Sequence, residues 1–210
     1  NQLTSLDVSN NTALTSLSCQ NNQITSLIIN NTKIGQIRLA DVFSFSNTVN
    51  NVLMPNPIIS LEFKNNSQLY FLRLDNEVPG IGNVALLNNL IVMNNPVLVL
   101  LNCETHFLTS LDVSTNTALK HLFCNNNQLT SLIFNDSTEN IDCSNNYLTC
   151  LDISSSPMLN INCSSNLLEQ FNTKNGLFNY LYIDATSNNL TCVEVDNIGH
   201  ATNNWEFDSF

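Results

Sequence analysis

A nested repeat constrains this chain more than any other feature, and it is clearest between residues 108 and 129. Each unit has apolar residues at positions 1, 4 and 6 and asparagine at position 9, and two units follow one another as Leu108, Leu111, Val113, Asn116, Leu119, Leu122, Cys124 and Asn127. The next pair begins at Leu129, so the period is about 21 residues, which is typical of one coil of a solenoid. The spacing within each unit matches neither the helical period of about 3.6 residues nor a long alternating strand.

The second unit of the pair, called the strand unit, predicts a very short strand. Its alternation places Leu122 and Cys124 inside the coil and His121 and Phe123 outside. Asn127 then turns the chain, because its amide can bond backbone groups beyond the strand. The first unit of the pair is called the outer unit. One coil cannot bury its own apolar face, so we expect coils stacked at roughly 4.8 Å.

These units resemble the leucine-rich repeat family, in its short nested class with a turn of about 21 residues. The resemblance implies a repeat solenoid, a leucine-rich repeat horseshoe or superhelix with short parallel β-strands on the concave face, mostly β and loop with little helix. We expect about eight coils over residues 1–189. Residues 190–210 resemble the C-terminal cap of secreted and cell-surface leucine-rich repeat domains of Bacteroidota, which implies that Trp205 and Phe210 pack over the last coil.

The repeat is interrupted in several places. Insertions are expected near residues 41–57 and 77–86. Within the first, segments 34–44 and 48–58 both match a strand unit but start only about 14 residues apart, too few for a coil, so one of them is a bulge or loop. Further on, one coil is shortened, since Thr138 begins its strand unit fewer than 21 residues after Leu119 begins the previous one. No polar cap precedes Leu3, and we expect residues upstream of the given sequence to supply one.

The seven cysteines do not form a disulfide framework in this interpretation. Five of them occupy position 6 of a strand unit and are expected to be small buried side chains, namely Cys19, Cys103, Cys124, Cys143 and Cys163. Neighbouring parallel strands point these side chains the same way, which is poor geometry for a bridge. Cys150 and Cys192 lie about two coils apart, so no bridge is expected there either.

Charge limits the partners. The net charge of −11 comes from 17 acids and 6 bases, and after Lys120 a single base, Lys174, stands against ten acids. The absence of a basic stripe excludes nucleic acid as the expected partner. The acidic second half would favour a cationic partner, or else it is a solubilising surface. No signal peptide or membrane span is recognisable, so no membrane insertion is expected.

Catalytic, cofactor and metal motifs are missing from the sequence. None of the three histidines, His106, His121 and His200, belongs to a motif for nucleophile activation, and His106 falls at an asparagine position of the repeat. The five glycines form no phosphate-binding loop. Asp112 and Asp152 lack a ligand-rich calcium loop. The sequence therefore predicts no enzyme activity, cofactor or metal.

The exposed positions of successive strand units line the concave face, where such solenoids usually bind their ligands. An aromatic and cationic cluster is expected at its centre, flanked by polar residues. The candidate ligand-binding residues are Arg38, Phe71, Arg73, Leu100, His121, Phe123, Asp142 and Tyr182. Such a cluster suits protein recognition and also stacking on sugar rings. The alternative is that the inserted loops cover it.

We therefore predict a non-enzymatic extracellular or cell-surface recognition module that binds a protein partner, such as an envelope or host protein, through the concave face and inserted loops. A carbohydrate-binding or adhesion module, or a structural spacer in a larger surface protein, remains as an alternative. The resemblance to Bacteroidota domains implies secretion by the type IX route or display at the cell surface.

Overall fold

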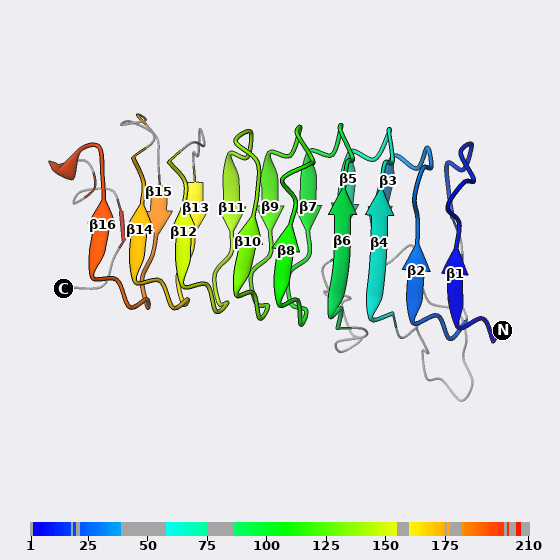
Figure 1. The fold of residues 1–210 in the computed structure, drawn as a ribbon, viewed down its shortest axis with the longest axis horizontal. Coiled ribbons are helices and arrows are strands. Elements are labelled where there is room, and N and C mark those ends of the chain that lie inside the picture. Colours follow the sequence, from blue (N-terminus) through cyan, green and yellow to red (C-terminus); the bar gives the residue numbers. More distant parts are fainter. Residues whose placement is uncertain are drawn as a thin grey trace.

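The computed structural model is an elongated stack of coils with parallel strands along two of its sides (Figure 1). It describes residues 2–17, 19, 22–38, 58–74, 86–154, 160–174, 176, 182–199, 201, 205 and 206. In these ranges helix is confined to residues 198, 199 and 201, and no helix there is long and apolar enough to cross a membrane. The prediction of a repeat solenoid that is mostly β and loop is confirmed.

One side of the stack is a seven-stranded parallel sheet, here called the continuous sheet. Its strands are β3 (Gln36–Arg38), β5 (Phe71–Arg73), β7 (Leu100–Asn102), β9 (His121–Phe123), β11 (Asn140–Asp142), β13 (Asn160–Asn162) and β15 (Tyr182–Asp184), each paired with the next. These are strand units of the sequence, and their outer surface is the face predicted to be concave. The sequence also has a strand unit at Leu14, Leu17, Cys19 and Asn22, but its described residues form no strand.

The other side is also a sheet, built from the outer units, and the sequence pattern did not predict its strands. It is divided into three parts and is called the split sheet. The parts are β1 (Ser5–Asp7), β2 (Ser26–Ile28), β4 (Ser60–Lys64) and β6 (Asn89–Met93); β8 (Ser110–Asp112) and β10 (Ser131–Ile133); and β12 (Cys150–Asp152), β14 (Gln170–Asn172) and β16 (Cys192–Glu194).

The core lies between the two sheets and is formed by the inward residue of each strand. Leu122 of the continuous sheet is 0% exposed and Leu111 of the split sheet is 2% exposed. Burying each such side chain stabilises the fold by about 1.5–3 kcal/mol. Beyond β16, Trp205 packs half-buried against this core, while Phe210 lies outside the described residues. The predicted division at residue 189 stays a prediction.

The five cysteines at position 6 are buried, as predicted. Cys103, Cys124, Cys143 and Cys163 follow consecutive strands of the continuous sheet and form a column, and none of the seven cysteines forms a disulfide bond. Burial raises the pKa of the Cys103, Cys124, Cys143 and Cys163 thiols, so they stay protonated. Cys150 and Cys192 are exposed on the split sheet, and β14 lies between their strands.

An asparagine ladder joins neighbouring coils just after the strands of the continuous sheet. The Asn146 side chain donates to the carbonyl oxygens of Cys124 (3.1 Å) and Cys143 (3.0 Å), and accepts a bond from the backbone N–H of Leu129 (2.9 Å). The same arrangement recurs at Asn127, Asn166 and Asn188. His106 takes the equivalent place, as its sequence position predicted: its ring bonds Leu74 O (2.7 Å) and Leu87 N (3.4 Å).

Strand pairing settles which segment of the first interruption belongs to the coil. β3 pairs directly with β5, Gln36 against Phe71, so the segment 34–44 supplies the strand. Residues 39–57 and 75–85, which include almost all of both predicted insertions, lie outside the described residues. Across the two interruptions β2 pairs with β4 and β4 with β6, so the strands on either side of each one remain in register.

Candidate functional site

Seven of the eight predicted binding residues lie on the outer face of the continuous sheet, in two rows that cross its strands, and Arg38 occupies the equivalent position of β3. The first row runs Gln36, Phe71, Leu100, His121, Asn140, Asn160 and Tyr182. The second row runs Arg38, Arg73, Asn102, Phe123, Asp142, Asn162 and Asp184. The parallel register produces this alignment, because each residue faces the equivalent residue of the next coil.

The predicted aromatic and cationic cluster is therefore contiguous. Phe71, Leu100 and His121 are neighbours in one row, and all three are half-buried. Phe123 is half-buried and Arg73 is exposed in the second row. Side chains that are half-buried in this way keep contact area for a partner while remaining packed on the sheet.

A shallow hollow of about 430 Å³ lies toward the C-terminal end of this face. It is lined by His121, Phe123, Asn140, Ile141, Asp142, Asn160, Ile161, Asn162 and Tyr182. The hollow brings together four of the predicted residues, namely His121, Phe123, Asp142 and Tyr182. The other four, Arg38, Phe71, Arg73 and Leu100, lie outside it toward the N-terminal end; the side chain of Arg38 is not described.

Hydrogen bonds hold the polar wall of this hollow in place. Asn160 Nδ2 donates to Asn140 Oδ1 at 2.7 Å, and Asn140 Nδ2 lies 3.1 Å from His121 Nδ1. An amide nitrogen only donates, so Nδ1 of His121 is the acceptor of this bond. The chain of amides thus sets the orientation of His121 at the edge of the hollow.

Two of the predicted residues also have local structural roles. Asp142 Oδ1 accepts bonds from the backbone N–H (3.0 Å) and hydroxyl (2.6 Å) of Ser144, which fixes the turn after β11. The Tyr182 hydroxyl donates to Glu206 Oε1 at 3.1 Å, and this bond raises the pKa of Tyr182. One carboxylate oxygen of Asp142 therefore stabilises a turn, whereas Tyr182 presents an exposed ring.

Asp112 and Asp152, which were considered as calcium ligands, fix turns of the split sheet in the same way as Asp142 fixes the turn after β11. Asp112 Oδ1 accepts the N–H of Ser114 at 3.0 Å, and Asp152 Oδ1 accepts the N–H of Ser154 at 2.9 Å. No three His, Cys, Asp or Glu residues gather into a metal-binding group within the described ranges.

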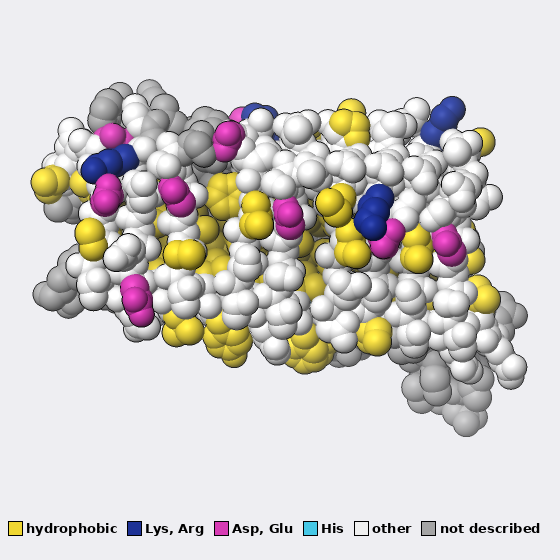
Figure 2. Space-filling model, in the orientation of Figure 1, with side chains coloured by type: hydrophobic (Ala, Val, Ile, Leu, Met, Phe, Trp, Pro, Cys, Tyr) yellow, Lys and Arg dark blue, Asp and Glu magenta, His cyan; other side chains and the backbone are white. Residues whose placement is uncertain are grey.

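The sequence did not predict a cleft of about 440 Å³ in the split sheet, which opens between β10 and β12 and extends over β14 and β16. Figure 2 shows apolar side chains at the bottom of a recess on this face, with acidic side chains along the surface. One signal was present in the sequence, because the shortened coil contains Thr138 and follows β10 directly. The second sheet was not predicted, so this shortening could not be connected with a surface feature.

No protein-family model matches the chain, and no curated protein matches it. A solved structure described as the functional domain of InlJ from Listeria monocytogenes, which includes a cysteine ladder, is similar to this chain with 20% sequence identity and a TM-score of 0.45. The similarity covers 100% of this chain and 53% of that chain. The chain thus spans about half the length of that structure.

Proposed function

We propose that this chain is a non-enzymatic recognition module that binds a protein partner through the outer face of its continuous sheet, outside the cell or at its surface. The observation that carries the proposal is the cluster of half-buried Phe71, Leu100 and Phe123 on three neighbouring strands, next to the hollow that runs from Phe123 to Tyr182. Protein interfaces concentrate their binding energy in such aromatic and aliphatic anchors surrounded by polar residues.

The sheet suits this role because hydrogen bonds within the chain hold its polar side chains in place before a partner binds. The Asn160–Asn140–His121 bonds and the turn at Asp142 hold the polar groups of the hollow in place. Binding then costs little side-chain entropy, which favours affinity at a modest contact area. An envelope or host protein is the partner expected for a secreted or surface-displayed module, and a type IX route fits the resemblance to Bacteroidota domains.

A glycan is the second candidate, and it has its own supporting observation. Phe123 and Tyr182 lie at the two ends of the hollow, with the amides of Asn140, Asn160 and Asn162 between them. Aromatic rings stack on the apolar faces of sugars, and amides bond their hydroxyl groups. A carbohydrate-binding or adhesion module would use this end of the face alone.

The proposal is tested by affinity capture from envelope and host-surface extracts, with a glycan array in parallel. The bait is wild type, Phe71→Ala/Phe123→Ala, or the control Tyr147→Ala, which removes an aromatic side chain that is 53% exposed and lies outside this face. A protein captured by wild type and Tyr147→Ala, and reduced about tenfold or more with the double variant, supports the proposal.

Other outcomes are equally informative. Array binding that Tyr182→Ala abolishes, without protein capture, replaces the protein proposal with the glycan one. Capture that all variants retain equally contradicts recognition through this face, and the absence of specific capture favours a structural spacer.

A further inference from the structure

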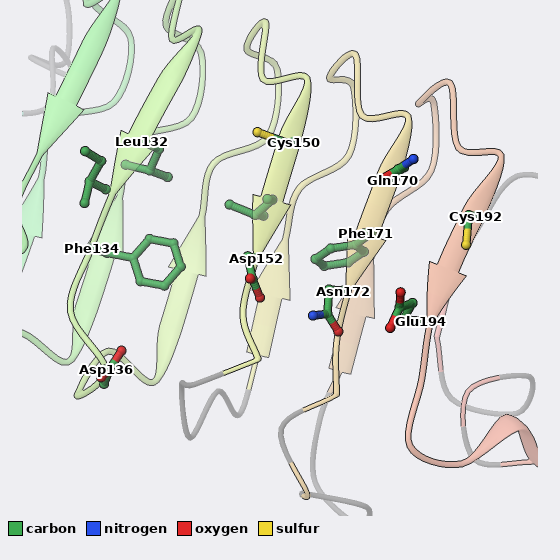
Figure 3. Close-up of a pocket in the computed structure, with 12 residues that line it drawn as sticks. Leu132, Phe134, Asp136, Cys150, Asp152, Gln170, Phe171, Asn172, Cys192 and Glu194 are labelled. Carbon is green, nitrogen blue, oxygen red and sulfur yellow. The ribbon is translucent and has the colours of Figure 1, made fainter.

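The cleft in the split sheet exposes side chains that other coils bury. Leu132 of β10 and Phe134 just after it are half-buried, whereas their equivalents one coil earlier, Leu111 and Val113, are 2% and 0% exposed. Buried Phe171 of β14 also lines the cleft. Figure 3 shows the Phe134 ring in the space between β10 and β12, and the Phe171 ring on the other side of β12. The cleft therefore has an apolar floor that reaches the core.

Acidic side chains lie along one edge of this floor. Asp136, Asp152 and Glu194 line the cleft, and Asp152 and Glu194 are exposed. Figure 3 shows Asp152 and Glu194 in one row with Asn172, and Asp136 in the turn after β10. Lys174 forms an ion pair with Glu194 at 2.9 Å. Asp136 and Asp152 form the rest of the acidic rim. An apolar floor under an acidic rim complements a side chain with an aliphatic stem and a cationic head.

We propose that the cleft between β10 and β12 binds an arginine-bearing segment of a partner protein. The arginine stem lies against Leu132 and Phe134, and the guanidinium group bonds the carboxylates of Asp136 and Asp152. Arginine fits better than lysine, because its planar group can stack on an aromatic ring and bond a carboxylate through two N–H groups at once. This surface is on the opposite sheet from the proposed protein-binding face and is independent of it.

The probe is a fluorescein-labelled peptide of alternating arginine and valine, compared with lysine–valine and glutamate–valine peptides by fluorescence anisotropy. We expect the arginine peptide to bind best and the glutamate peptide not at all. Asp152→Asn should weaken arginine-peptide binding about fivefold or more, and Phe134→Leu should weaken it as well.

A matched control separates the cleft from general attraction to an acidic protein. Asp112 occupies the same strand position as Asp152 and makes the same turn bond, but lies outside the cleft. Asparagine preserves that bond, as Asn172 shows by accepting the N–H of Lys174 at 3.1 Å. Asp112→Asn should therefore leave binding unchanged, and both variants should keep the wild-type unfolding midpoint.

Equal weakening by Asp112→Asn and Asp152→Asn would overturn the proposal in favour of nonspecific charge attraction. Unchanged binding in Phe134→Leu would show that the apolar floor takes no part and would overturn it too. Loss of peptide binding in Phe123→Ala would place the site on the other sheet and contradict the cleft directly. Failure of the protein-capture experiment has no bearing on these peptide results.

Discussion

The two sheets are built from the same repeat but differ in how firmly their coils are joined. In the continuous sheet, the N–H just after each strand donates to the next coil, as from Cys103 to Phe123 O and from Cys124 to Asp142 O, both at 2.8 Å. In the split sheet, Val113 donates to Ile133 O at 2.8 Å, but one coil later Phe134 makes no such bond to a described residue. The second sheet therefore loses its continuity where the cleft opens.

Chain length differs at the break that opens the cleft. The step from a continuous-sheet strand to the next split-sheet strand is ten residues from β7 onward, for example from His121 to Ser131. This step contains the asparagine ladder. The return step varies, with eleven residues from Ser110 to His121 but nine from Ser131 to Asn140. The ladder thus fixes one half of the coil, and the other half absorbs differences in length.

The shortest return step also lacks a second asparagine ladder, which follows the strands of the split sheet in other coils. Where that step has eleven residues, an asparagine in the turn joins neighbouring coils, as when Asn116 Oδ1 accepts the N–H of Asn95 at 3.0 Å. This bond persists even at the break between β6 and β8. After β10, Asn135 Oδ1 instead accepts the N–H of Ser137, two residues on, at 2.8 Å. The Asn135 oxygen therefore closes a local turn, and only its amide nitrogen, which donates to Asn116 O at 2.8 Å, still contacts the preceding coil.

The largest effect is expected from the buried thiols beside the continuous sheet. Burial raises the pKa of Cys103, Cys124, Cys143 and Cys163 above their ordinary value near 9, so they ionise in the unfolded chain first. Their contribution to stability is complete below pH 9 and is lost as the pH rises above it. Each thiol lowers the free energy of unfolding by about 1.4 kcal/mol per pH unit there, or about 5 kcal/mol for four.

Urea unfolding between pH 8 and 10.5, under reducing conditions, measures this loss. The double variant Cys124→Ala/Cys143→Ala should remove about half of the slope that these four thiols give to the unfolding free energy against pH. A wild-type slope near zero above pH 9 would contradict burial of the column.

The next effect distinguishes the ladder from its local replacement. Asn146→Ala removes buried bonds to Leu129, Cys124 and Cys143, and should lower the free energy of unfolding by about 3–4 kcal/mol. Asn135→Ala removes one turn bond and one bond to Asn116 O (2.8 Å) in a half-buried place, and should cost about 1 kcal/mol. Chemical denaturation of both variants provides the comparison. Equal losses of unfolding free energy would show that the ladder stabilises the fold no more than the local turn does.

The smallest effect concerns the shortened return step. Thr138 is 0% exposed, and its hydroxyl has no partner among the described residues. It stands where neighbouring coils have Leu119 or Leu98. Thr138→Val should therefore raise the free energy of unfolding by about 1 kcal/mol, because it removes a buried unsatisfied group at nearly constant volume. A thermal or urea melt that shows destabilisation instead would mean that the hydroxyl is bonded.

The sequence predicted the continuous sheet well, because its signals are strictly local. Leu122 and Cys124 alternate with Phe123, and Asn127 follows at a constant distance, so strand, core, cysteine column and ladder could all be placed. The predicted binding residues could be aligned for the same reason, since the strand-unit pattern marks the equivalent residues of each coil even where the coil length differs. Their role in binding stays a prediction.

The split sheet and its cleft could not be predicted in the same way. Outer units carry the same apolar spacing whether or not their strands pair, so the pattern around Leu111 and that around Leu132 look alike. The cleft depends on how a shortened return step is accommodated in three dimensions. Only the early arrival of Thr138 hinted at it.

Native-state hydrogen exchange at Phe134 tests the central difference between the sheets most directly. Three amides in equivalent places are compared by NMR: Cys124 in the continuous sheet, Val113 in the intact part of the split sheet, and Phe134 at the cleft. We predict that Cys124 and Val113 exchange slowly and that Phe134 exchanges at least about 100-fold faster, because its N–H bonds no neighbouring coil in the part of the chain that the structure describes. Protection of Phe134 equal to that of Val113 would show that β10 and β12 are joined, and would contradict both the split and the cleft.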